Sequence, residues 1–217
     1  MDNKVKKITL LAMLSAVAFV AVEFIRIPAV EFLKYEPKDV VIVIGGFMYG
    51  PLAAVIISVI VALVEMVTIS DTFLYGCIMN IISSCAFAGT ASFIYKKHHS
   101  MKGAIEGLSL AVILTTAVMM LWNYIVTPLY MGMQRDAIAA MLPTVFLPFN
   151  ILKGLLNSGI TLLIYKPVVT ALRKARLFDE HKRSGAKARK TNIGMLLIAA
   201  FAIITGVLMI LVLKDVI

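Results

Sequence analysis

Long runs of apolar residues dominate this chain and limit the folds that it can adopt. They cover residues 8–25, 40–67, 73–95, 104–129, 143–165 and 193–213. A helix needs about 20 apolar residues to cross a bilayer. Hydrophobic residues make up 61% of the 217 residues and charged residues only 15%, which is too apolar for a water-soluble surface. We therefore predict an all-α, polytopic membrane protein.

The run over residues 40–67 is too long for one span. It contains Gly45, Gly46 and the pair Gly50-Pro51, which supply flexible backbone followed by a residue that cannot donate to the preceding turn. We predict a short helix over residues 39–49 and a second helix over residues 51–68. The first run resembles a signal peptide, but similar runs follow it, so we expect an uncleaved first span.

The distribution of Lys and Arg predicts the orientation. Three lysines precede the first run, and the densest basic cluster lies between residues 166 and 190. Because cytoplasmic flanks attract positive charge, we predict seven helices in the cell membrane, with the N-terminus cytoplasmic and the C-terminus outside. Residues 1–172 would form a six-helix bundle, residues 173–191 a basic cytoplasmic linker, and residues 192–217 an additional transmembrane helix.

Several classes of function lack their motifs. The basic residues form no patch interleaved with aromatic residues, so their expected partner is the anionic lipid bilayer and not nucleic acid. No GxxxxGK[ST] sequence is present to hold nucleotide phosphates. The three histidines fall in the basic loops, where we expect them to be solvated, and Cys77 and Cys85 are interpreted as small core residues.

The acidic residues complete these exclusions. Glu23, Glu65 and Glu106 lie near predicted span ends, where a carboxylate can reach water. We therefore expect no buried pair of carboxylates for acid–base chemistry. The chain is predicted not to be an enzyme and to need no cofactor or metal.

Lys153 is the sharpest anomaly, because it stands deep in the run that begins at Pro143 and an ammonium is costly there. Asn150 and Asn157 lie three residues before it and four after it, so all three share one face of a helix. One interpretation is a ligand site, in which case we expect a depressed pKa of the amine or a partner for its charge. The other is a lysine that snorkels outward, with asparagines that bridge helices.

The preceding run carries a matching polar stripe. Asn123 and Thr127 lie on one face of it, flanked by Trp122 and Tyr124. These two aromatic residues are either anchors at the membrane interface or rings that stack on a ligand.

Two further segments have functional interpretations. Residues 26–39 mix apolar and charged residues with two prolines; with Tyr35 and Asp39 they form either a lid over a cavity or a loop in the headgroup region. In the first helix, Ala12 and Ala16 make a face of small residues that permits another helix to approach.

Several of these segments together resemble one transporter family. Residues 34–39 (KYEPKD), 123–130 (NYIVTPLY) and especially 148–154 (PFNILKG) are similar in order and spacing to the riboflavin-specific S component of energy-coupling factor (ECF) vitamin transporters. The similarity extends over residues 1 to about 175. The family pattern has six helices, so the basic linker and the seventh helix depart from it.

The resemblance implies a substrate-binding membrane subunit that captures riboflavin with high affinity from outside and does not hydrolyse ATP. Its partners would be a transmembrane coupling protein, which Ala12 and Ala16 would contact, and two ABC ATPases. The ligand-binding residues would be Asn150, Lys153, Asn123, Tyr35, Asp39, Thr127, Asn157, Trp122 and Tyr124. The alternatives are an S component for a different vitamin or nucleobase-like solute, or a membrane scaffold without transport activity.

Overall fold

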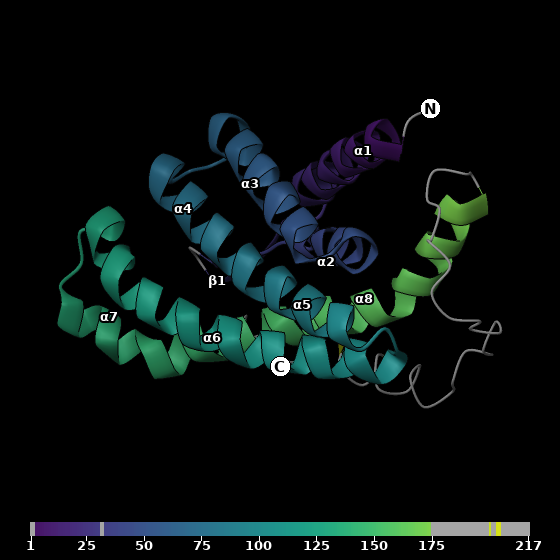
Figure 1. Cartoon of the computed structure of the whole chain (residues 1–217). Coiled ribbons are helices and arrows are strands. Elements are labelled where there is room, and N and C mark those ends of the chain that lie inside the picture. The colour runs from purple at the N-terminus through teal and green to yellow at the C-terminus, as the bar shows by residue number, and fades with distance from the viewer. Residues whose placement is uncertain (1–2, 31–32, 175–199, 201–202, 205–217) are drawn as a thin grey trace.

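The structure is a computed structural model, and it describes residues 3–30, 33–174, 200, 203 and 204. Within these residues the fold is all-α apart from one small hairpin (Figure 1), as the sequence predicts. The helices are α1 (Asn3–Phe24), α2 (Lys38–Tyr49), α3 (Pro51–Thr68), α4 (Phe73–Ser84), α5 (Thr90–Lys97), α6 (Met101–Met131), α7 (Arg135–Met141) and α8 (Leu147–Lys174). One π-helical turn, η1 (Cys85–Gly89), joins α4 to α5, and another, η2 (Leu142–Phe146), joins α7 to α8.

The helices fit a membrane bundle. Counting α4 with α5 and α7 with α8, five helices in the described part of the chain are long and apolar enough to cross a membrane. Helix α2 has only 12 residues. The predicted break before α3 is confirmed: Gly50 has φ of +92°, a region that favours glycine, and Pro51 occupies the first turn of α3.

The last helical segment differs from its prediction at its start. It begins at Arg135, eight residues before the expected start at Pro143. A proline inside an α-helix removes a backbone donor, and the π-helical turn η2 accommodates Pro143. Lys153 therefore lies even further from the start of its helix than the sequence indicates.

The segment between α1 and α2 forms structure that the sequence analysis did not predict. Strands β1 (Ile27–Val30) and β2 (Leu33–Tyr35) pair antiparallel, with Ile27 opposite Tyr35 and Pro28 opposite Lys34. The hairpin returns the chain to the bundle directly before α2.

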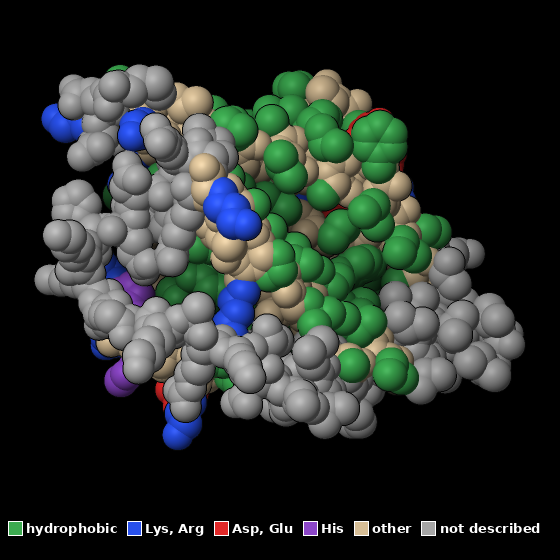
Figure 2. Space-filling model, turned by 90° about the vertical axis from the view of Figure 1, so that its right-hand side faces the viewer, with side chains coloured by type: hydrophobic (Ala, Val, Ile, Leu, Met, Phe, Trp, Pro, Cys, Tyr) green, Lys and Arg blue, Asp and Glu red, His purple; other side chains and the backbone are tan. Residues whose placement is uncertain are grey.

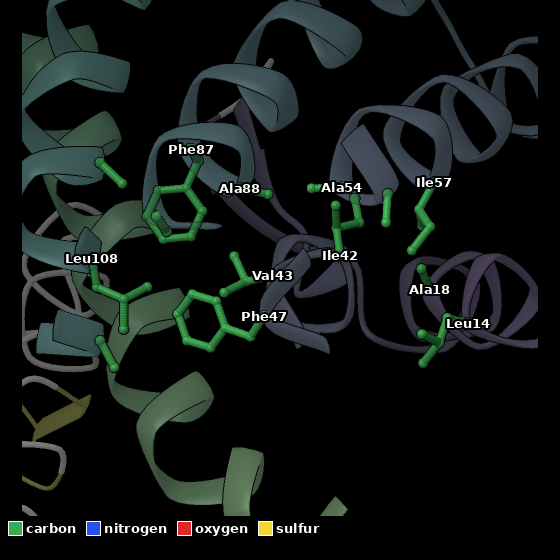
Figure 3. Close-up of a cluster of buried hydrophobic side chains, with 14 of the residues drawn as sticks. Leu14, Ala18, Ile42, Val43, Phe47, Ala54, Ile57, Phe87, Ala88 and Leu108 are labelled. Carbon is green, nitrogen blue, oxygen red and sulfur yellow. The ribbon is translucent and has the colours of Figure 1, made fainter. Parts of the chain in front are cut away.

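Helix α2 lies at the centre of the apolar core (Figure 3). Ile42 packs with Ala54 and Ile57 of α3 on one side, and Phe47 lies near Phe87 and Leu108 on the other. This packing needs glycine at position 46, because an added Cβ would overlap with the side chain of Ser92 and lie 2.9 Å from the Cβ of Ala54. The core thus fixes α2 between α3 and the helices α5 and α6.

The surface of the described part is largely apolar. Figure 2 shows one side of the molecule, on which hydrophobic side chains gather over the centre and upper right, and most of the visible Lys, Arg and His side chains lie toward the left and near the centre. Ala12 and Ala16 are exposed on α1. An exposed apolar belt is expected of a protein whose solvent is lipid.

The predicted basic linker (173–191) lies outside the described residues except for its first two positions. The predicted seventh helix (192–217) does so except for residues 200, 203 and 204. Ile203 packs against a small buried cluster of Tyr35, Leu152 and Leu156. Part of the C-terminal extension therefore contacts both the end of the hairpin and α8.

Candidate functional site

A cavity of about 370 Å³ lies at the end of the bundle that carries the hairpin. This volume is in the range of pockets for drug-sized ligands, about 300–1,000 Å³. Its lining comes from the C-terminal parts of α3 and α6, the loop between α3 and α4, one face of α4, the N-terminal part of α8, and the hairpin segment. The lining residues are Arg26, Leu33, Lys34, Glu36, Glu65, Ile69, Ser70, Asp71, Thr72, Gly76, Met79, Asn80, Ser83, Met119, Asn123, Tyr130, Phe149, Asn150 and Lys153.

Three predicted ligand-binding residues converge on this cavity. Asn123 lies on α6, and Asn150 and Lys153 lie on α8, one turn apart. The Asn123 amide donates to the carbonyl of Met119 (2.7 Å), and the Asn150 amide donates to the carbonyl of Phe146 (2.8 Å). Each amide group has a second N–H and a carbonyl oxygen, so both side chains keep hydrogen-bonding capacity for a ligand.

Lys153 has the charge partner that the sequence analysis expected. Its Nζ lies 3.4 Å from Oδ2 of Asp39, at the start of α2. Asp39 is 1% exposed. It also accepts hydrogen bonds from Ser84 (2.5 Å) and from the Asn157 amide (3.3 Å). The carboxylate is therefore stabilised on several sides, as a buried charge requires, and the amine does not snorkel to the surface.

Three other predicted residues lie behind the cavity wall. The Tyr35 hydroxyl donates to Oδ1 of Asn157 (2.9 Å), so Asn157 links the hairpin to Asp39. Thr127 donates to Oδ1 of Asn123 at 3.3 Å. Tyr35, Asn157 and Thr127 are at least 96% buried and are absent from the lining. They position the residues that face the cavity.

Burial of Tyr35 and the nearby charge of Asp39 raise the pKa of the Tyr35 phenol. The phenol therefore stays protonated and can donate its hydrogen bond at physiological pH. Because this end of the hairpin is buried against the bundle, the lid interpretation of residues 26–39 is favoured over a loop in the headgroup region.

The rings of Trp122 and Tyr124 lie away from the cavity. Neither lines the cavity, and Tyr124 is 38% exposed on the outer surface. Successive residues on a helix are 100° apart, so the neighbours of the inward-facing Asn123 point to the sides of α6. The apolar lining comes instead from Met79, Met119 and Phe149, with Leu33 and Ile69.

A buried ion cluster corrects the prediction that no pair of carboxylates is buried. Glu65 is 2% exposed, and Lys38 joins it to Glu36: Nζ lies 2.5 Å from Glu65 and 2.8 Å from Glu36. Asn80 also donates to Glu65 (2.8 Å). Buried carboxylates therefore exist, and Glu36 and Glu65 share one lysine. Sequence reasoning missed Lys38; the signal that could have found it is Glu65, a lone charge in the apolar α3.

Polar contacts tie the hairpin segment to the bundle. Arg26 donates to Glu36 (3.1 Å) and to the carbonyl of Ile69 (3.0 Å), and Lys34 pairs with Asp71 (2.6 Å). Burial raises the pKa of Glu36, but the neighbouring cations outweigh burial and lower it overall. Glu36 therefore remains ionised near neutral pH. The hairpin is held as a cover over one side of the cavity.

Comparison with known proteins identifies the family. Residues 6–165 match the model of the family described as "ECF transporter, substrate-specific component". The chain belongs to this family. It is therefore a membrane-embedded subunit of a transporter and not an enzyme, as the sequence analysis predicts.

Individual relatives agree with this assignment. The riboflavin transporter RibU of Staphylococcus aureus (strain TCH60) is 32% identical over 179 residues, which cover 78% of this chain and 93% of that protein. The riboflavin transporter FmnP of Bacillus subtilis (strain 168) is 28% identical over 190 residues, 80% of this chain and 99% of that protein. A solved structure, described as "Structure and mechanism of the S component of a bacterial ECF transporter", matches with a TM-score of 0.67 at 31% identity and covers 79% of this chain and 99% of the other.

Proposed function

We propose that this chain binds riboflavin with high affinity on the outer side of the cell membrane and is the substrate-specificity subunit for its uptake. The observation that carries the proposal is the convergence of Asn123, Asn150 and Lys153 on a cavity of about 370 Å³. The names of the relatives support the same ligand.

The chemistry of the cavity suits the flavin ring. The pyrimidine edge of riboflavin alternates carbonyl acceptors with an N–H donor, and asparagine side chains offer both kinds of partner. Lys153 can donate to a ring carbonyl or nitrogen. Because Asp39 already compensates its charge at 3.4 Å, the ligand need not be an anion. Met79, Met119 and Phe149 supply apolar surface for the faces of the ring.

Uptake requires partners that use ATP. We infer a transmembrane coupling protein and two ABC ATPases, with Ala12 and Ala16, exposed on α1, as the face that contacts the coupling protein. The N-terminus would be cytoplasmic, so the hairpin end of the bundle would face outward. We also propose that residues 173–191 are a basic cytoplasmic linker and that residues 192–217 form an additional transmembrane helix. The family match, which ends at residue 165, assigns no role to either.

Titration of the purified protein in detergent tests the proposal. We expect a yellow preparation or, after removal of bound flavin, saturable binding of one riboflavin below micromolar concentration. Thiamine and biotin are the control ligands, and Asn150→Leu should weaken only riboflavin binding. A monodisperse, folded protein that does not bind micromolar riboflavin, or that binds a control vitamin more tightly, refutes the proposal.

A further inference from the structure

Among the residues that the structure describes, Ile203 joins the C-terminal extension to the bundle. Its side chain is half-buried and packs against Tyr35, at the end of β2, and Leu152 and Leu156 of α8. These three partners are only 1–4% exposed. The family match ends at residue 165, so the contact is made by a part of the chain that lies outside the match.

The next residue shows that only one face of this segment meets the bundle. Residues 203 and 204 are helical, and successive residues on a helix point about 100° apart. Ile204 is 58% exposed, whereas Ile203 is half-buried. Burial on one side and an apolar residue exposed on the other are expected of a helix that packs on the outside of a membrane bundle, where the solvent is lipid.

The contact also joins matching positions along two apolar segments. Ile203 stands at the middle of the apolar run over residues 193–213. The candidate span built from α7, η2 and α8 covers Arg135–Leu172, and Leu152 and Leu156 flank its middle. Two segments that cross the same bilayer bring their middles to the same depth. The contact therefore fits an extension that crosses the membrane beside α8.

Tyr35 links this contact to the hairpin. Its hydroxyl donates to Oδ1 of Asn157 (2.9 Å), and its ring packs against the two leucines of α8 and against Ile203. Tyr35 is the last residue of β2, so whatever fixes its ring also fixes the end of the hairpin. Apolar contacts inside a membrane depend on close packing, and removal of atoms from Ile203 would leave part of the ring without neighbours.

We propose that the face formed by Tyr35, Leu152 and Leu156 is the docking site of the C-terminal helix (192–217) of the same chain, and that this helix holds the hairpin in its position over the cavity. Ile203 is a positioning residue, because it acts on the hairpin through the ring of Tyr35. A movement of the hairpin away from the bundle then requires this ring to leave both α8 and Ile203. One further step rests on the proposed function: the C-terminal helix slows the release of riboflavin past the hairpin.

A disulfide cross-link in the full chain tests the docking. The two native cysteines are first replaced by Ala. Cysteine at Leu152 or Leu156 is then combined with Ile203→Cys or, as the matched control, with Ile204→Cys, and the protein is oxidised in its membrane. A protease site inserted into the basic linker (173–191) separates the C-terminal helix from the bundle unless a disulfide joins them.

We expect the fragments with Ile203→Cys to stay joined at the mass of one chain, and those with Ile204→Cys to separate. Equal cross-linking of the two positions, or none at either, overturns the docking. A disulfide that forms only between two chains overturns it as well, because the C-terminal helix would then belong to a second copy.

Amide hydrogen exchange of β1 and β2 in the full chain tests the effect on the hairpin without any ligand. In Ile203→Ala the strands should exchange about three- to tenfold faster, less than for a fully buried isoleucine because Ile203 is only half-buried. Ile204→Ala is the control and should not change the rate. In a Tyr35→Ala background, Ile203→Ala should add nothing, because the two residues act through one contact. An unchanged rate in Ile203→Ala, an equal increase in Ile204→Ala or an additive effect with Tyr35→Ala contradicts the positioning role.

Riboflavin release from the same variants separates this inference from the proposed function. Ile203→Ala should release riboflavin about three- to tenfold faster, since most effects of a lost contact on affinity are in the dissociation rate, and Ile204→Ala should release it at the native rate. Release at the native rate from Ile203→Ala refutes the effect of the C-terminal helix on the ligand. If the native chain binds no riboflavin, the proposed function fails, and the cross-link and the exchange rates still decide the docking and the positioning role.

Discussion

Replacement of Lys153 by Met separates a structural role of the ion pair from a role in binding. The change leaves the Asp39 carboxylate, whose side chain is 2% exposed, without the ammonium at 3.4 Å. Loss of one partner of a buried pair costs about 3–5 kcal/mol. Ser84 and Asn157 still donate to Asp39, so we expect the lower end, about 3 kcal/mol, which is roughly a 6–12 °C fall in Tm for a chain of this size.

The same variant should also lose ligand affinity. A hydrogen bond to a charged group contributes about 1.5–3 kcal/mol, which corresponds to a roughly 10- to 150-fold increase in the riboflavin Kd. The double variant Lys153→Met/Asp39→Asn removes both charges. Replacement of a whole buried pair is often neutral for stability, so the double variant should recover most of the Tm but none of the affinity.

Thermal unfolding in detergent and riboflavin titration measure the two effects on the same samples. Lys174→Met, an exposed lysine on the same helix, is the matched control and should change neither quantity. If the double variant recovers affinity together with stability, Lys153 only supports the fold and does not meet the ligand. If Lys153→Met leaves the Tm unchanged, the ion pair of Lys153 with Asp39 does not stabilise the protein.

Three other changes probe the hairpin and the proposed docking face. Replacement of Ala12 or Ala16 by Leu should leave riboflavin binding intact but abolish uptake into cells. Normal uptake in both variants would exclude this face of α1 as the contact with the coupling protein. Tyr35→Phe leaves the Asn157 oxygen without its donor. An unsatisfied buried group costs about 1–3 kcal/mol, so riboflavin should dissociate about 5- to 150-fold faster in a stopped-flow displacement assay. The pKa of Glu36 is lowered, so the stabilisation that its ion pairs give to the hairpin is present above the ordinary carboxyl value of about 4.3 and is lost as pH falls through the lowered pKa. The rate at which riboflavin dissociates should therefore be constant from about pH 5 to 8 and rise only in more acidic buffer.

The sequence predicts the helices well, because hydrophobic length and the Gly50-Pro51 break are local properties. The start of the last segment is less predictable. Pro143 reads as a helix start, but the π-helical turn at residues 142–146 lets the helix continue through it from Arg135. The hairpin at residues 27–35 was missed because its strands are only four and three residues long and lack the alternation that marks a half-buried strand.

Within the site, helical spacing brought Asn150 and Lys153 correctly to one face. It could not show that Asn157, on the same stripe, turns to Asp39 and not to the cavity. The Lys38–Glu65 contact joins residues 27 positions apart on different helices, and no local pattern encodes such a pair. Glu65 on α3 is as unusual in an apolar helix as Lys153 on α8. The sequence analysis placed Glu65 near a span end, in reach of water, because nothing in the sequence shows that the hairpin covers it.

The charges at the start of α2 explain why a short helix can organise this site. Lys38 and Asp39 are consecutive, so their side chains leave the helix about 100° apart, one toward Glu65 of α3 and the other toward Lys153 of α8. A rotation of α2 about its axis would break both pairs at once, because each charge would leave its partner for an apolar surface. The two pairs therefore fix the rotation of α2. Tyr35 and Glu36 lie immediately before this helix and contact Asn157 and Lys38. One five-residue segment therefore sets both the position of the hairpin and the position of the amine that faces the cavity.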